Sequence, residues 1–261
     1  MYRAFELLSE GGKRFAGFEE AGQRFFEQQA GSVRKKIGDY VRDGVLDGND
    51  VISDWFGQIQ ADVFISHSHA DKELAVSLAG WLSQKMSLRP FVDSYVWGHA
   101  DELLREIDKD HCWSDEREVY DYNARNRSTS HVHMMLSTAL TQMIDNTECI
   151  IFLNTPQSFK NESLKLSRPT QLAAEQETSS PWIYAELVAT QCLRTKLQRK
   201  VLTEDSVRKA EASLESLDVR YRARTAHLTP LDDQRVTRWE ATGSRGIAAL
   251  DALYEMFPRG R

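Results

Sequence analysis

Asp62-Val-Phe-Ile-Ser-His-Ser-His-Ala-Asp71 is the stretch that decides the fold, because an apolar run leads directly into a helical pattern. Residues 63–65 are apolar and of strand-forming types, which is typical of a buried strand. The apolar residues that follow have the spacing of one helical face: Leu74, Leu78, Trp81 and Leu82. A strand that continues into a helix after a short turn indicates the first β-α unit of a parallel sheet.

Further apolar runs extend this pattern along the chain. Residues 90–92 and 149–153 predict a second and a third strand, and a helix over residues 131–145 leads to the third. A last strand is predicted within residues 221–228, ahead of a closing helix over residues 247–257. Strands that alternate with helices indicate an α/β domain with a parallel sheet and crossover helices.

The rest of the chain lies outside this alternation. Residues 1–60 show helical periodicity without strand runs, so we predict an N-terminal helical extension ahead of a main domain over residues 61–261. Two polar stretches, near residues 108–130 and 157–179, are interpreted as insertions into the main domain. The first is interpreted as an irregular loop, long enough to close over a site and to contact a substrate through its tyrosines and arginines.

A second informative stretch is Ser180-Pro-Trp-Ile-Tyr-Ala-Glu186, which has the signature of a helix start. Ser180 is a good N-cap residue and Pro181 suits the first helical position. Trp182 and Glu186, four residues apart, are then expected on one face of the helix. Because ligands of open parallel sheets bind at the carboxyl ends of the strands, Glu186 is expected at that edge.

The two quoted stretches, together with strands ending in Phe91-Val-Asp93 and Cys149-Ile-Ile-Phe-Leu153, resemble the TIR domain family, many of whose bacterial members cleave NAD. The resemblance covers roughly residues 61–257 and implies a flavodoxin-like parallel sheet. It also implies that Glu186 is the catalytic residue. NAD would be a substrate and not a redox cofactor, since no G-x-G-x-x-G follows the first strand.

The resemblance further implies which residues contact the substrate: Phe64, Ser66, His67, Asp93, Trp97, Gly98 and Trp182. Ser66 and His67 match the family position at the end of the first strand that contacts the nucleotide, although a histidine there also suits a capped surface position. Trp97 falls in the family's mobile BB loop, where a ligand or a neighbouring subunit would explain it equally well. Trp182 either stacks on nicotinamide or adenine, or fills the junction beside Glu186.

The chemistry of NAD explains how one carboxylate can suffice. Ordinary glycoside hydrolysis uses two carboxylates, one of which protonates the leaving group. Nicotinamide leaves from a cationic ring, so that a single carboxylate that binds the ribose hydroxyls and offsets the oxocarbenium charge is enough. The implied products are nicotinamide and linear, cyclic or conjugated ADP-ribose. Proteins that this chain resembles often act in antiphage immunity of the Thoeris type, where the product signals to a separate effector protein.

Two alternatives from other functional classes remain open. The first is a non-catalytic TIR adaptor that works only by homotypic assembly, against which the carboxylate at position 186 argues. The second is a zinc-dependent hydrolase, because His67-Ser-His69-Ala-Asp71 fits an H-x-H-x-D pattern after a strand. Lys72 stands where that pattern places its next histidine, and Ser68 and Asp71 also fit an ordinary capping box.

Composition restricts the remaining functional classes. The 261 residues are 41% hydrophobic and 28% charged, which is enough for one well-packed α/β domain and an accessory segment. A formal net charge of −6 gives no global positive field, so no nucleic-acid partner is expected. The apolar runs are too short to span a membrane, and the three cysteines show no pairing pattern. We therefore expect a cytoplasmic protein. The resemblance to TIR domains implies that it forms homo-oligomers through TIR contacts.

Overall fold

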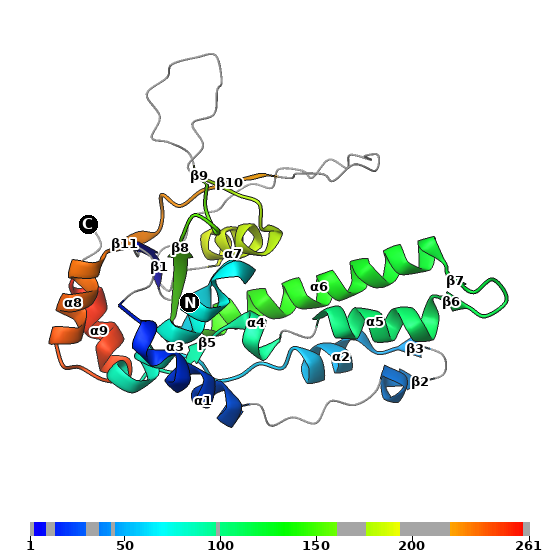
Figure 1. Ribbon diagram of the computed structural model, residues 1–261, viewed down its shortest axis with the longest axis horizontal. Coiled ribbons are helices and arrows are strands. Elements are labelled where there is room, and N and C mark those ends of the chain that lie inside the picture. Colours follow the sequence, from blue (N-terminus) through cyan, green and yellow to red (C-terminus); the bar gives the residue numbers. More distant parts are fainter. Residues whose placement is uncertain are drawn as a thin grey trace, which may run out of the picture.

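The computed structural model describes residues 3–8, 14–29, 37–42, 45–97, 100–160, 176–193 and 220–257 (Figure 1). Its centre is a five-stranded parallel sheet in the order β11-β1-β8-β4-β5. The strands are β1 (Arg3–Leu8), β4 (Val63–Ser66), β5 (Pro90–Phe91), β8 (Cys149–Asn154) and β11 (Thr229–Leu231). The predicted α/β class is thus confirmed, and the sheet is compatible with a flavodoxin-like fold.

Helices cover both faces of this sheet. One face packs against α1 (Glu19–Gln29), α3 (Lys72–Met86), α8 (Asp233–Ala241) and α9 (Ile247–Glu255). The other face packs against α2 (Gly48–Trp55), α6 (Tyr122–Asn146) and α7 (Pro181–Cys192). The two layers form separate hydrophobic cores, because alternate residues of each strand point to opposite faces.

Further helices and strands complete the described part of the chain. The remaining helices are α4 (Asp93–Val96), α5 (Ala100–His111) and the 3-10 turns η1 (Ala16–Phe18), η2 (Ile37–Tyr40) and η3 (His69–Asp71). Three two-stranded antiparallel ribbons pair β2 (Val41–Arg42) with β3 (Val45–Leu46), β6 (Trp113–Ser114) with β7 (Val119–Tyr120), and β9 (Gln176–Thr178) with β10 (Tyr221–Ala223). Residues 221–223 therefore do not form the last strand of the main sheet, which is β11.

The expectation of a strand-free segment before residue 61 is wrong. β1 lies near the middle of the sheet, parallel to β8 on one side and to β11 on the other. Phe5 and Leu7 are buried in one core, and Ala4 in the other, so the strand is sandwiched between helical layers. In the flavodoxin-like order 2-1-3-4-5, β5, β4 and β8 take the first three places, and β1 takes the fourth.

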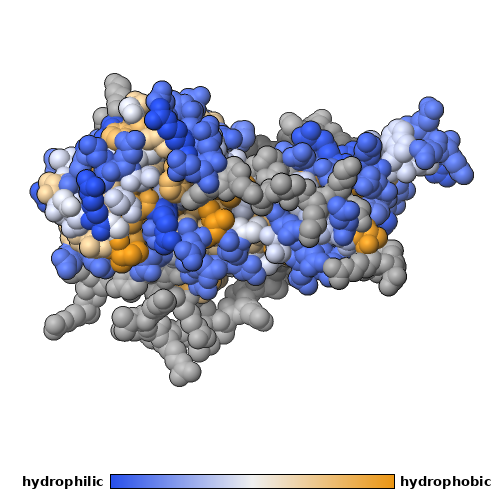
Figure 2. Space-filling view, turned by 90° about the horizontal axis from the view of Figure 1, so that it is seen from below, coloured by the Kyte–Doolittle hydropathy of each residue, from blue (hydrophilic) through white to orange (hydrophobic). Residues whose placement is uncertain are grey.

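Residues 108–130 are not the irregular loop that was expected. They form the ends of α5 and α6 and the β6-β7 ribbon between them, so the two helices make an arm that extends away from the sheet (Figure 1). Arg125 Nε donates to Asp108 Oδ2 at 2.9 Å and Ser128 Oγ donates to Asp108 Oδ1 at 2.5 Å, which joins the two helices. In Figure 1 the β6-β7 tip of this arm points away from α7. On the face shown in Figure 2 this arm is mainly hydrophilic.

Of the second predicted insertion, residues 161–175 lie outside the described residues. Residues 157–160 form a turn after β8, and residues 176–178 form β9. Among the helices of the described ranges, none has the length and apolar content that a membrane crossing requires.

Two glycines allow α1 and α3 to pack closely. A Cβ at Gly80 would overlap the carbonyl oxygen of Phe18 and lie 2.6 Å from the nitrogen of Gly22. Since both neighbours are backbone atoms, the helices would have to move apart. We expect Gly80→Ala to lower the free energy of unfolding by about 1–3 kcal/mol, measured by urea denaturation. Gly17→Ala is the matched control, because a Cβ at Gly17 meets nothing within 4 Å; equal stability of the two variants would contradict this account.

Candidate functional site

The candidate site lies where two neighbouring strands send their connections to opposite faces of the sheet. β4 continues into α3 on one face, whereas β8 leads to α7 on the other. Such a divergence opens the carboxyl ends of the strands and is the usual ligand position in open α/β sheets. Ser66 is the last residue of β4, and Glu186 reaches this point from α7. Glu186 thus lies at the carboxyl edge of the sheet, as expected.

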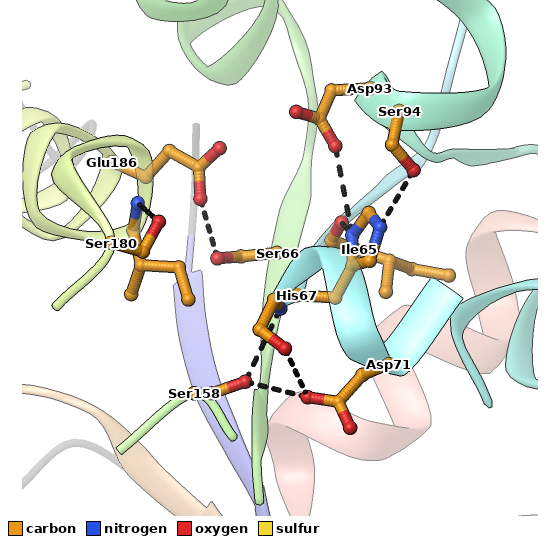
Figure 3. A network of polar contacts seen from close by, with 11 residues as sticks. Ile65, Ser66, His67, Asp71, Asp93, Ser94, Ser158, Ser180 and Glu186 are labelled. Carbon is orange, nitrogen blue, oxygen red and sulfur yellow. Dashed lines mark hydrogen bonds and ion pairs between the residues drawn. The ribbon is translucent and has the colours of Figure 1, made fainter. Parts of the chain in front are cut away.

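Glu186 is held in place by its helix and by Ser66 (Figure 3). Ser180 caps α7 as predicted, accepting a hydrogen bond from the Ile183 amide at 3.3 Å, and Pro181 is the first helical residue. One turn later, the Glu186 carboxyl accepts a hydrogen bond from Ser66 Oγ, with an Oγ to Oε2 distance of 2.5 Å. The Glu186 residue is 3% exposed, so the hydrogen bond lies out of water.

Burial dominates the electrostatics of this carboxyl group. It raises the pKa of Glu186 well above the ordinary value of 4.5, because a charge is poorly solvated there. The Asp93 carboxylate raises the pKa further by repulsion, and the hydrogen bond from Ser66 lowers it in part. The site therefore favours a neutral carboxyl group until a positive charge comes close to it.

His67 links the strand end to the segment after β5. Its Nε2 lies 2.8 Å from Ser94 Oγ, and its Nδ1 lies 3.6 Å from Asp93 Oδ1 and 3.4 Å from the carbonyl oxygen of Ile65 (Figure 3). The His67 side chain is 1% exposed, whereas that of Asp93 is 24% exposed. The ring thus lies between Ser94 and Asp93, and the Asp93 carboxylate is the more accessible group. Ser94 was missed, although it directly follows the predicted Asp93.

Two predicted contact residues belong to the hydrophobic core instead. Phe64 is 0% exposed and its ring packs on that of Phe91 with centroids 5.2 Å apart. Trp97 is 4% exposed and packs edge-on against Phe91 and Phe56, while its Nε1 donates to the carbonyl oxygen of Gly57. The expectation that the Trp97 ring faces a ligand or a second subunit is wrong, because the start of the segment folds into α4 and turns this ring inward.

The other two predictions have different outcomes. Gly98 lies outside the described residues. Trp182 is half-buried at the start of α7 and meets the His133 ring of α6 edge-on, with centroids 5.6 Å apart. This contact favours the interpretation that Trp182 fills the junction beside Glu186, where α6 packs on α7.

The residues of the zinc alternative do not converge. Asp71 Oδ2 accepts hydrogen bonds from Ser68 at 2.8 Å, Thr155 at 2.6 Å and Ser158 at 3.0 Å, which ties η3 to the turn after β8. His67 is engaged with Ser94, and His69 is exposed. Within the described ranges no three His, Cys, Asp or Glu side chains group in a way that could hold a metal ion. The H-x-H-x-D pattern is therefore a turn with a polar network.

The carboxyl groups of this site can interact with a cation and with a sugar. A buried carboxyl group with a hydroxyl donor and a neighbouring carboxylate attracts positive charge, and in a site of low polarity that attraction is strong. The same groups can accept hydrogen bonds from hydroxyls of a sugar. Comparisons of the chain with protein-family models, with curated proteins and with solved structures found no match.

Proposed function

We propose that this chain is a TIR-domain enzyme that breaks the nicotinamide–ribose bond of NAD. The observation that carries the proposal is the buried Glu186 carboxyl at the carboxyl edge of a parallel sheet, hydrogen-bonded to Ser66 and close to Asp93. A pyridinium nucleotide brings a positive charge to such a site. That charge favours ionisation of Glu186, which otherwise resists it.

The reaction follows from this electrostatic match. As the bond between C1′ and the ring nitrogen breaks, nicotinamide departs with the bonding electrons and positive charge develops on the ribose. The ionised Glu186 stabilises that charge and accepts hydrogen bonds from ribose hydroxyls, while Ser66 holds the carboxylate in place. Water adds at C1′ and releases a proton to the solvent, giving nicotinamide and ADP-ribose. Capture by another nucleophile would give a cyclic or conjugated product.

We also propose a role in signalling. A nucleotide product of this kind can act on a separate effector protein, as the resemblance to Thoeris-type antiphage systems implies. We further propose a cytoplasmic homo-oligomer. Self-association through Trp97 is not part of this proposal, because that ring is buried.

A direct assay tests the function. Purified protein is incubated with NAD, with and without a chelator, and nicotinamide is followed by chromatography while the other product is identified by mass spectrometry. We expect nicotinamide release that persists in chelator. Well-folded protein that releases none would favour the adaptor alternative, and stoichiometric zinc whose removal abolishes activity would favour the hydrolase.

Ser66→Ala tests how the hydrogen bond from Ser66 affects the pKa of Glu186. The hydrogen bond from Ser66 lowers the pKa of Glu186, so its loss should raise that pKa further. Because the ionised form is required, activity is lost as pH falls through this pKa. We expect the acid limb of the kcat/KM profile to move to higher pH in the variant, with roughly tenfold lower activity at neutral pH. Ser77→Ala, at a buried serine of α3, should leave the profile in place; an unshifted limb in Ser66→Ala would argue against the proposed link.

A further inference from the structure

A second polar pair lies at the carboxyl edge of the sheet, one strand beyond the candidate site. Asn154, the last residue of β8, donates from Nδ2 to Glu6 Oε1 of β1 at 2.5 Å. β8 leads to α7 on one face, whereas α1, the next described α-helix after β1, packs on the other. The chain after β8 therefore leaves on the opposite face from the chain after β4 and after β1, the two strands beside it. One polar pair lies at each of these two places.

The strand register puts both pairs on the same face. Ser66 is opposite Phe152 in the pairing of β4 with β8, and Phe152 is opposite Glu6 in the pairing of β8 with β1. Residues in lateral register point to the same side of a sheet. Glu6 is therefore two strand spacings, or about 10 Å, from Ser66 along one edge. One ligand of dinucleotide length can reach both.

The Glu6 carboxyl has capacity for a ligand. It is half-buried, and burial raises its pKa, while hydrogen bonds from Asn154 and Gln176 act in the opposite direction. A carboxylate offers about four acceptor positions, so these two donors do not saturate it. Hydroxyl groups of a ligand would fill the remaining positions and offset part of the cost of burial.

We propose that Glu6 and Asn154 bind the hydroxyls of the adenosine ribose of a dinucleotide whose nicotinamide ribose lies at Ser66 and Glu186. This inference rests on the proposed function and adds a substrate preference to it. A carboxylate at this position accepts hydrogen bonds from the 2′ and 3′ hydroxyls, but repels a 2′-phosphate. The chain should therefore prefer NAD to NADP.

The test compares the two dinucleotides in wild type, Glu6→Gln and Glu148→Gln. Glu148 precedes β8 at the opposite edge of the sheet and serves as the control. We expect wild type and control to favour NAD in kcat/KM, and Glu6→Gln to reduce the NAD/NADP ratio at least about tenfold, as expected for one hydrogen bond to a charged group. If Glu6→Gln does not fold, Asn154→Ala, which removes the hydrogen bond to Glu6, should reduce the ratio in the same direction.

A binding measurement separates this inference from the proposed function. Calorimetry with ADP-ribose and with 2′-phospho-ADP-ribose needs no turnover, so it decides the matter even in a protein that does not cleave NAD. The subsite would be supported if wild type binds ADP-ribose more tightly than 2′-phospho-ADP-ribose, and if this difference in affinity is smaller in Glu6→Gln. A NAD/NADP ratio or an affinity difference that Glu6→Gln leaves unchanged, or no binding of either compound, would overturn it.

Discussion

Glu186→Gln is expected to reduce NAD cleavage by more than about 10²-fold, the size of one lost electrostatic stabiliser. Glutamine has nearly the same volume and can still accept the hydrogen bond from Ser66, so packing at the start of α7 should be kept. What the variant lacks is the ability to ionise when positive charge develops on the ribose. Nicotinamide release at saturating NAD measures the effect directly.

The stability of the same variant provides an independent check. Because the folded state raises the pKa of Glu186, the stabilisation linked to its neutral form is present below about pH 4.5 and is lost as pH rises through the raised pKa. Glutamine stays neutral throughout. We therefore expect Glu186→Gln to be at least as stable as wild type at neutral pH. Its free energy of unfolding should also lack the decrease that wild type shows as pH rises.

The control for Glu186 is Glu177, another buried glutamate, which is 8% exposed and faces Arg220. Glu177→Gln should leave the rate of nicotinamide release within a fewfold of wild type. Wild-type turnover by folded Glu186→Gln protein would remove the basis of the proposed mechanism.

Trp97→Ala is expected to lower the free energy of unfolding by about 3–5 kcal/mol, the usual cost of deleting a large buried aromatic ring. The ring fills space between Phe56 and Phe91, and its loss would leave a cavity beside the end of β5. Urea denaturation followed by circular dichroism measures the change. The more conservative Trp97→Phe should cost less, because it keeps most of the packing.

Trp113 is the matched control, since it is 43% exposed at the tip of the arm. Trp113→Ala should change the stability by less than about 1 kcal/mol. If Trp97→Ala instead left stability unchanged and altered the sedimentation coefficient, the ring would serve subunit contact, contrary to its position in the core.

Local sequence patterns were sufficient to predict several helices and strands of this protein. The apolar run of β4, the helical spacing of α3 and the Ser180-Pro181 start of α7 were all predicted from neighbouring residues. Strand and helix periodicity, like capping, arises from contacts within a few residues, so the sequence alone carries it. The expectation that Glu186 lies near the carboxyl edge combined this helix start with the general position of ligand sites in open parallel sheets.

The tertiary structure decided which segments meet. Ser66 and Glu186 are 120 residues apart, and only the packing of α7 against the sheet brings them within hydrogen-bond distance. The run of β1 mixes charged and apolar residues and gave no clear strand signal, yet its pairing with β8 brings it into the sheet and puts Glu6 next to Asn154. Trp97 is buried because α4 turns it towards Phe91. Periodicity shows that a face is apolar, whereas the partner that covers it is set by long-range packing.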